Sequence, residues 1–206
     1  MNFIFDFDGT ICDSLDITIG ILNAYAKKLN RPQITKENFR TKGIEALINE
    51  YHFNKLQVLL YVLKGRQELS KHINEMKSYE GLPEVLKKLS EKNNLGIVSS
   101  NSSKNIERFL KNNNLASYFK FIYSSTSLFD KSKKIKSAMQ KYDLKASETV
   151  YIGDEIRDIK AAHDINLNCI SVSWGFESKK LLREYAPNFL ISYPKELLST
   201  EKQLLH

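Results

Sequence analysis

A short apolar run at the start of the chain ends abruptly in two carboxylates, a glycine and a hydroxyl residue, and this stretch constrains the fold more than any other. Residues 3–5 (Phe-Ile-Phe) predict a buried strand, and Asp6-Phe-Asp-Gly-Thr10 follows at once. Side chains alternate along a strand, so Asp6 and Asp8 point the same way, with their α-carbons about 6 to 7 Å apart. Gly9 lets the chain turn away and leaves both carboxylates at the carboxyl end of a strand, where open α/β sheets bind their ligands.

The segment after Thr10 is helical in pattern and too long for a simple crossover. No strand-like run appears before Leu95, and apolar residues recur at helical spacing in two stripes: Leu15, Ile19, Leu22 and Ala26, then Leu56, Leu59, Leu60 and Leu63. The second stripe predicts a helix that ends near Gly65. A crossover needs only about a dozen residues. We therefore predict that residues 15–79 form an inserted α-helical cap and that residues 1–14 and 80–206 form the core.

The core segment alternates short apolar runs with helical patterns. Strands are predicted at 95–99, 119–123, 149–152 and 169–172, with a short edge strand at 189–191; helices are predicted at 104–113, 132–142, 156–165 and 178–185. Strands that alternate with helices indicate a parallel sheet with right-handed crossovers. The predicted fold class is α/β, a doubly wound, Rossmann-like parallel sheet with the helical cap inserted.

Composition limits the partners. The chain has a formal net charge of +7, which attracts nucleic acid, a membrane surface or small phosphorylated compounds. The sequence has no long block of consecutive basic residues that would favour nucleic acid as the partner. It also has no apolar run that approaches the roughly 20 residues of a membrane span. Cys12 and Cys169 have no metal-ligand spacing and fit two reduced thiols. We expect a cytoplasmic protein, monomeric or weakly dimeric, that binds neither nucleic acid nor membrane.

Three further motifs match the first one. Ser100 and Asn101 follow the apolar run 95–98, a group of lysines starts at Lys131, and Gly153-Asp-Glu-Ile-Arg-Asp158 follows the run 150–152. Together with Asp6-x-Asp-x-Thr10, these motifs resemble the haloacid dehalogenase-like superfamily of phosphohydrolases over nearly the whole chain. The stretch from Asp8 to Ser14 and the sequence Trp174-Gly-Phe176 are similar to its phosphoglycolate-phosphatase-like branch.

The resemblance implies a role for each matched residue. Asp6 takes the nucleophile position, and its neighbour Asp8 can protonate the leaving oxygen and later deprotonate water, because a nearby carboxylate raises its pKa. Thr10, Ser100 and Asn101 are expected to bind the phosphoryl group. A lysine must balance the phosphoryl charge, and Lys131 fits the register better than its alternatives Lys133 and Lys134.

The same carboxylates predict a magnesium site. Asp6, the backbone carbonyl of Asp8, and Asp154 form an oxygen-only set that suits octahedral Mg²⁺, and Asp158 either holds a metal-bound water or is a further ligand. The other reading makes Asp158 a first-turn acid favoured by the helix dipole. Glu155 and Arg157 are expected to face solvent or the rim of the site.

The expected function is a Mg²⁺-dependent phosphatase that hydrolyses small, phosphoglycolate-like phosphomonoesters through a phospho-Asp6 intermediate. The alternatives are a sugar phosphomutase of the same fold and a basic nucleic-acid-binding protein with a relic site. The segment 39–43 (Phe-Arg-Thr-Lys-Gly) is predicted to connect two cap helices, so that Lys42 and Gly43 contact the substrate beyond its phosphate. An ordinary helix connection explains this segment equally well.

Overall fold

Six parallel strands form one sheet. The computed structural model describes residues 1–125 and 130–204; residues 126–129, which precede the predicted lysine motif, lie outside this range. The strands run in the spatial order β3-β2-β1-β4-β5-β6, and every neighbouring pair is parallel. Their bounds are β1 Asn2–Phe5, β2 Asn94–Ser99, β3 Phe119–Ser124, β4 Thr149–Gly153, β5 Asn168–Val172 and β6 Phe189–Ile191. The predicted α/β fold class is confirmed.

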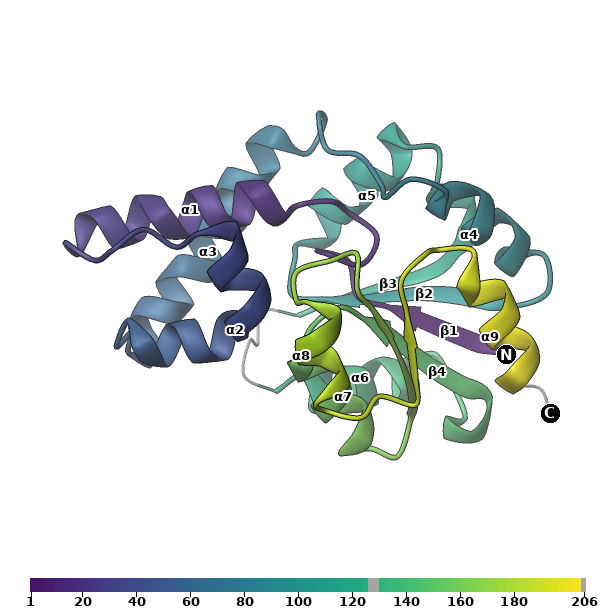
Figure 1. Cartoon of the computed structure of the whole chain (residues 1–206). Helices are drawn as coiled ribbons and strands as arrows, with labels where there is room; N and C mark the ends of the chain where they lie inside the picture. Colours follow the sequence, from purple (N-terminus) through teal and green to yellow (C-terminus); the bar gives the residue numbers. More distant parts are fainter. Residues whose placement is uncertain (126–129, 205–206) are drawn as a thin grey trace.

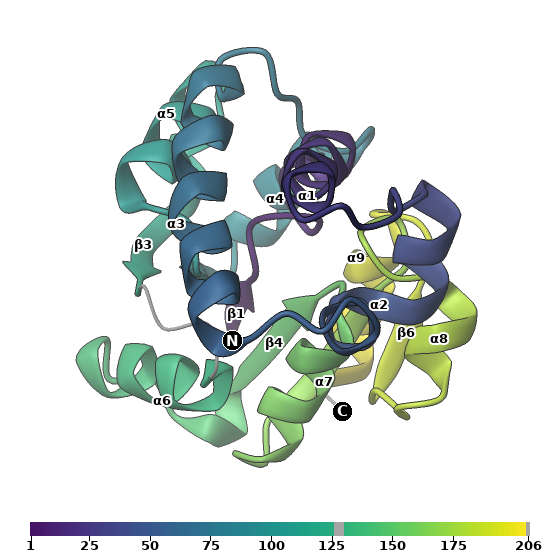
Figure 2. The ribbon, with the colours of Figure 1, turned by 90° about the vertical axis from the view of Figure 1, so that its left-hand side faces the viewer.

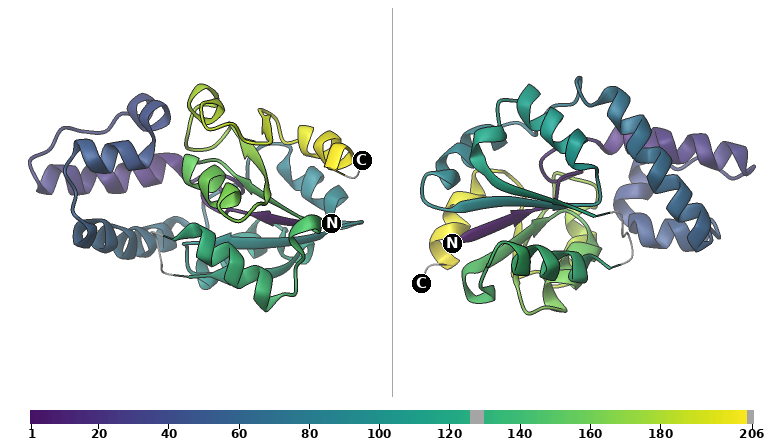
Figure 3. Two further views of the ribbon diagram at one scale, coloured as in Figure 1. Left: turned by 90° about the horizontal axis from the view of Figure 1, so that it is seen from below. Right: turned by 180° about the vertical axis from the view of Figure 1, so that it is seen from behind.

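Helices cover both faces of the sheet (Figure 3). Successive side chains of β1 point to opposite faces, so Phe3 and Phe5 belong to one core cluster and Ile4 to another. The first cluster includes apolar side chains of α4 (Leu82–Ser90), α5 (Ser103–Asn112) and α9 (Glu196–Leu204). The second includes side chains of α6 (Lys131–Lys141), α7 (Ile156–His163) and α8 (Lys179–Arg183). Two short 3₁₀ turns, η1 (Ala116–Tyr118) and η2 (Ala146–Glu148), lead into β3 and β4.

The parallel arrangement brings three predicted motifs to one edge of the sheet. β1 lies between β2 and β4, and Phe5, its last residue, is in register with Ile97 and Ile152. Asp6, Ser100 and Asp154 each follow the carboxyl end of one of these strands. Residues more than 50 positions apart in the chain therefore lie together because the strands run in the same direction.

A helical insertion, made of α1 (Leu15–Lys28), α2 (Lys36–Glu50) and α3 (Lys55–His72), lies beyond this edge (Figures 1 and 2). It has a small core of its own, to which Phe176 of the main body contributes. The predicted end near Gly65 is wrong, because α3 continues to His72. Leu56, Leu59, Leu60 and Leu63 do share one stripe of α3, but they are exposed.

Two negative observations hold for the described residues. No helix there is long and apolar enough to cross a membrane. Cys12 and Cys169 are both buried and unpaired. The predicted free thiols are therefore present.

Candidate active site

Asp6 is buried and held from two sides. Its Oδ1 accepts a hydrogen bond from the backbone N–H of Phe7 at 2.8 Å, and its Oδ2 lies 2.5 Å from Nζ of Lys131. Burial alone would raise the pKa of Asp6, but the charges of Lys131 and Arg157 outweigh burial and lower it. The Asp6 carboxylate is therefore ionised at neutral pH, as a nucleophile must be.

Asp8 has the opposite electrostatic setting. Ser14 donates its hydroxyl to Oδ1 at 3.0 Å, and the Asn101 amide donates to Oδ2 at 3.0 Å. Burial and the nearby charge of Asp6 raise the pKa of Asp8 to about 6. A carboxyl group that titrates near neutral pH can both give and take a proton. Of the two aspartates in the first motif, Asp6 is thus the ionised group and Asp8 the group that can carry a proton.

Asp158 completes a cluster of carboxylates. One oxygen each of Asp6, Glu155 and Asp158 lie within 4.8 Å of one another, and all three residues are buried. Oδ2 of Asp158 accepts the backbone N–H groups of Asp154 and Glu155 at 3.1 and 2.9 Å, and its Oδ1 pairs with Lys131. Asp158 is therefore both the first-turn acid of α7 and a member of the cluster, so the two readings of the sequence do not exclude each other.

Asp154 lies beside this cluster but outside the group of oxygens within 4.8 Å. Its two oxygens accept the Thr10 hydroxyl at 2.6 Å and the backbone N–H of Phe176 at 2.8 Å. Burial and the charges of Glu155 and Asp158 raise its pKa well above the ordinary value. Such crowding of buried negative charge is relieved by a cation, and a donor set made only of oxygens suits Mg²⁺. The residues present thus fit the predicted metal.

Glu155 and Arg157 are the residues that the sequence interpretation missed. The expectation that Glu155 faces solvent or the rim is wrong: its side chain is 2% exposed and pairs with Arg157, whose Nε lies 2.7 Å from Oε2. Arg157 is half-buried and lines the cavity described below. The only signal in the sequence was the acidic pair Glu155 and Asp158 at the start of a helix, which is also the pattern of an ordinary capping arrangement.

Two of the three candidate lysines reach the site. Lys131 contacts Asp6 and Asp158, and Nζ of Lys134 donates to the Ser100 hydroxyl at 2.8 Å. Lys133 is exposed and pairs with Asp130. Burial and the charge of Lys131 lower the pKa of Lys134 to about 7. An incoming anion next to Ser100 would therefore strengthen the charged form of Lys134.

The side chains of Thr10 and Asn101 were expected to bind the phosphoryl group, but both are hydrogen-bonded to carboxylates of the site. Thr10 is 1% exposed and its hydroxyl is used by Asp154. Asn101 is 2% exposed and its amide is used by Asp8, while Asn105 donates to its carbonyl oxygen at 3.0 Å. Both side chains orient carboxylates of the site, and Ser100 is left as the hydroxyl that is accessible near Lys134.

The segment 39–43 reaches the main body, but not through Lys42. Residues 39–42 are helical, and Gly43, with a φ of 76°, is a kink at which two helical stretches meet within α2, so the predicted connection between two cap helices is this single residue. Lys42 is exposed and pairs with Glu50 at 2.6 Å, so the structure does not bring it to the site. Arg40 instead donates to the carbonyl oxygens of Ser173, at 3.0 Å, and Gly175.

Gly43 packs against the side chain of Glu177. A Cβ at this position would come within 2.4 Å of the Glu177 carboxylate, so the close approach requires glycine. Gly43 is buried. Gly43 therefore connects α2 to the main body. It was expected to contact the substrate, but the structure places the Glu177 side chain against it instead.

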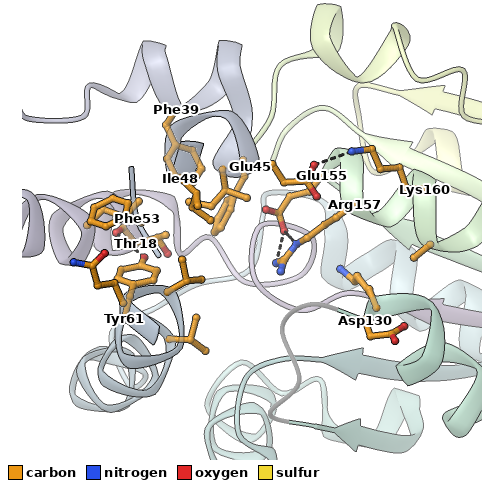
Figure 4. A pocket seen from close by; sticks show the side chains of 18 of the residues that line it. Thr18, Phe39, Glu45, Ile48, Phe53, Tyr61, Asp130, Glu155, Arg157 and Lys160 are labelled. Atoms are coloured by element: carbon orange, nitrogen blue, oxygen red, sulfur yellow. Dashed lines mark hydrogen bonds and ion pairs between the residues drawn. The ribbon is translucent and has the colours of Figure 1, made fainter. Parts of the chain in front are cut away.

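A cavity of about 520 Å³ opens between the helical insertion and the carboxylate cluster (Figure 4). Lys131, Glu155 and Arg157 line it on the side of the main body. Its other wall comes from α1, α2, α3 and the Phe176 side chain. The cavity can thus hold a small molecule, and Lys131 connects its lining to Asp6, which lies behind that lysine.

A doubly wound parallel sheet with a carboxylate pair and a buried lysine at its carboxyl edge defines an α/β enzyme with an aspartate-centred site. The chain belongs to the haloacid dehalogenase-like hydrolase family, whose sequence model matches residues 3–172. The recognition made from the motifs is confirmed.

Relatives along the full length are named as phosphatases. The chain is 29% identical to a phosphoglycolate phosphatase of Synechococcus elongatus, with 98% of this chain and 97% of the relative covered. It is 21% identical to the pyrophosphatase PpaX of Bacillus mycoides, with 95% and 94% covered. Its fold is similar to that of a predicted phosphatase from Clostridium acetobutylicum, with a TM-score of 0.84, 23% identity and 98% of both chains covered. A haloacid dehalogenase-like hydrolase from Streptococcus pneumoniae has a TM-score of 0.78 and 26% identity over 97% of both chains.

Proposed function

We propose that this hydrolase is a Mg²⁺-dependent phosphatase that cleaves small phosphomonoesters through a phospho-Asp6 intermediate. The observation that carries the proposal is the contrast between the two aspartates: Asp6 has a lowered pKa beside Lys131, whereas the pKa of Asp8 is about 6. Covalent catalysis needs an ionised nucleophile and a separate group that carries the proton, and this pair supplies both.

The residues divide the reaction into two steps. In the first, a carboxylate oxygen of Asp6 attacks phosphorus, the bond from phosphorus to the ester oxygen breaks, and Asp8 gives its proton to the departing alcohol. In the second, Asp8 takes a proton from water, which attacks the phosphorus and restores Asp6 with release of inorganic phosphate. Lys131, Lys134 and the Ser100 hydroxyl balance the charge on the phosphoryl oxygens during both steps.

The magnesium ion would be held by oxygens of Asp6, Asp154 and Asp158 with the backbone carbonyl of Asp8. Glu155 is an additional candidate, because its carboxylate lies in the same cluster. When bound, the ion offsets the repulsion between these carboxylates and an anionic substrate. Thr10 and the N–H of Phe176 orient Asp154, while the N–H groups at the start of α7 orient Asp158.

Residues 15–79 act as a cap in this proposal. The insertion supplies one wall of the cavity and excludes water from the site while the phosphoryl group is transferred. The two buried, unpaired cysteines agree with a reducing compartment such as the cytoplasm. The names of the relatives make 2-phosphoglycolate and pyrophosphate the first compounds to assay.

The test is the covalent intermediate itself. Wild-type protein mixed with substrate and Mg²⁺, quenched with acid and examined by mass spectrometry should gain one phosphoryl group on the peptide that contains Asp6. Asp6→Asn should remain folded, gain nothing and release no phosphate, whereas Asp13→Asn, which changes an exposed aspartate nearby, should behave as wild type. Substantial turnover by Asp6→Asn would refute the mechanism. Conversion of glucose 1-phosphate to glucose 6-phosphate without net phosphate release would instead identify a phosphomutase.

A further inference from the structure

The two walls of the cavity differ in chemistry (Figure 4). The main body contributes charged groups, whereas the helical insertion contributes an almost continuous apolar and aromatic wall. Phe39, Ile48, Phe53 and Tyr61 belong to that wall. Lys131, the partner of Asp6, lines the charged side, so the proposed reaction puts the phosphate there and the alcohol part of the substrate faces the apolar wall.

The cations of the cavity already have partners. Arg157 pairs with Glu155, and Lys131 pairs with Asp6 and Asp158. Lys160 lies 2.7 Å from a carboxylate oxygen of Glu45, a pair that joins the main body to the insertion. Among the described residues that line the cavity, each lysine and arginine is therefore matched by a carboxylate. A second negative charge on the substrate would therefore meet no unpaired cation here and would have to compete with one of these carboxylates.

The size of the cavity also favours a substrate whose alcohol is apolar. About 520 Å³ is within the range of pockets that enclose drug-sized ligands, roughly 300 to 1,000 Å³. A glycolate or second phosphate unit occupies only a small part of that space and leaves the apolar wall in contact with water. An apolar ring occupies more of it and removes apolar surface from water on both partners.

Resting on the phosphatase activity proposed above, we infer that the preferred substrates are phosphomonoesters whose alcohol carries an apolar ring and no second charge. The insertion then selects the alcohol by burial of its ring, and the Glu45–Lys160 pair excludes acidic alcohols by leaving no free cation. Small phosphomonoesters with a second acidic group, such as 2-phosphoglycolate with its carboxylate, are poor substrates under this inference.

The test compares benzyl phosphate with 2-phosphoglycolate in the presence of Mg²⁺. Both esters release an aliphatic alcohol, so a difference in rate does not come from a phenolic leaving group. We expect kcat/KM for benzyl phosphate to be at least about tenfold higher, which corresponds to about 1.4 kcal/mol. An equal or higher value for 2-phosphoglycolate would overturn the inference.

Two variants test the two walls separately. Glu45→Gln removes the partner of Lys160 and should shift the ratio of the two kcat/KM values at least about threefold toward 2-phosphoglycolate. Glu50→Gln is the matched control, because it frees Lys42 outside the cavity and should leave the ratio unchanged. Ile48→Asn should lower kcat/KM for benzyl phosphate several-fold and leave that for 2-phosphoglycolate unchanged. An unchanged ratio in both Glu45→Gln and Ile48→Asn would contradict the assignment of the walls.

Binding separates failure of this inference from failure of the proposed activity. Benzylphosphonate and phosphonoacetate are the corresponding non-hydrolysable probes, and their effect on Tm is measured with Mg²⁺ present. A larger rise in Tm with benzylphosphonate supports the inference even if neither ester is hydrolysed, in which case only the proposed activity fails. A larger rise with phosphonoacetate overturns the inference, whatever the turnover.

Discussion

Three lysines near the start of α6 sit in three different environments, and replacing each by methionine tests the electrostatics of the site. Lys131 is buried between Asp6 and Asp158, and the side chains of this lysine and these two aspartates are 7% exposed or less. Lys133 pairs with Asp130 in solvent, and its side chain is 82% exposed. Lys134 is buried next to a hydroxyl and carries a lowered pKa of about 7.

Lys131→Met should be strongly destabilising without metal. The substitution keeps an unbranched side chain, one atom shorter, but leaves two buried carboxylates without the lysine cation, a loss that costs about 3–5 kcal/mol. For a chain of this size each kcal/mol corresponds to roughly 2–4 °C, so Tm in EDTA should fall by about 6–20 °C. Lys133→Met, the matched control, should leave Tm nearly unchanged because solvent screens its pair. Lys134→Met should also have little effect on Tm, since it loses no carboxylate partner.

Addition of Mg²⁺ makes this prediction specific for the site. A cation bound to Asp6 and Asp158 replaces part of the missing charge, so Mg²⁺ should raise the Tm of Lys131→Met more than that of wild type. The assay is thermal unfolding followed by circular dichroism, in EDTA and in excess Mg²⁺. A melting temperature for Lys131→Met within about 2 °C of wild type in EDTA, or equal rises with Mg²⁺ in the two proteins, would refute the reasoning. Lys131→Met should also lose turnover, because Lys131 balances the phosphoryl charge.

Three further experiments probe other contacts. EDTA should abolish phosphate release and Mg²⁺ should restore it, with Ca²⁺ a poor substitute because of its looser, higher-coordinate shell; full activity in metal-free buffer would contradict the metal assignment. Burial and Glu155 raise the pKa of Glu177 from 4.5 to about 8, so the native state holds this proton more tightly than the unfolded state. Its contribution to stability is then complete below pH 4.5 and is lost, by at most about 5 kcal/mol, as pH rises through 8; Glu177→Gln should flatten this dependence in urea titrations, and an unchanged slope would count against it. Arg40→Gln should expose the insertion to faster limited proteolysis, because two hydrogen bonds to the main body weaken, while Arg31→Gln at an exposed position should not; equal cleavage rates would rule out Arg40 as the anchor.

The sheet was predictable because its strands are short apolar runs bounded by polar residues. The predicted strand at 189–191 matches β6, and each of the others differs from the observed strand by one residue at one end. The helical insertion was predictable from the absence of strand patterns between Thr10 and Leu95. The end of α3 was not, because Gly65 is a buried residue inside a helix that continues to His72, and a single glycine weakens a helix without ending it.

The contacts of the site residues were less predictable than their positions. A motif places Thr10 and Asn101 near the carboxylates, but whether a hydroxyl or an amide faces substrate or another side chain depends on neighbours far along the chain. Thr10 meets Asp154 across 144 positions, and Asn101 meets Asp8 across 93. Likewise, Glu155 is buried because Arg157 folds back over it, and no local pattern distinguishes that pair from two exposed charges.

The segment that follows β5 explains why the insertion and the carboxylate cluster form one site. The N–H of Phe176 fixes Asp154, and the Phe176 ring packs edge-to-face on Phe39 of α2 at 5.6 Å. Arg40, the next residue of α2, holds the carbonyl oxygens of Ser173 and Gly175 in the same segment. A displacement of α2 therefore acts on the segment 173–176, whose last residue orients Asp154. The contacts between α2 and this segment join residues more than 130 positions apart in the sequence. Trp174-Gly-Phe176 could therefore be recognised as a family motif, but its physical role could not be predicted from the sequence.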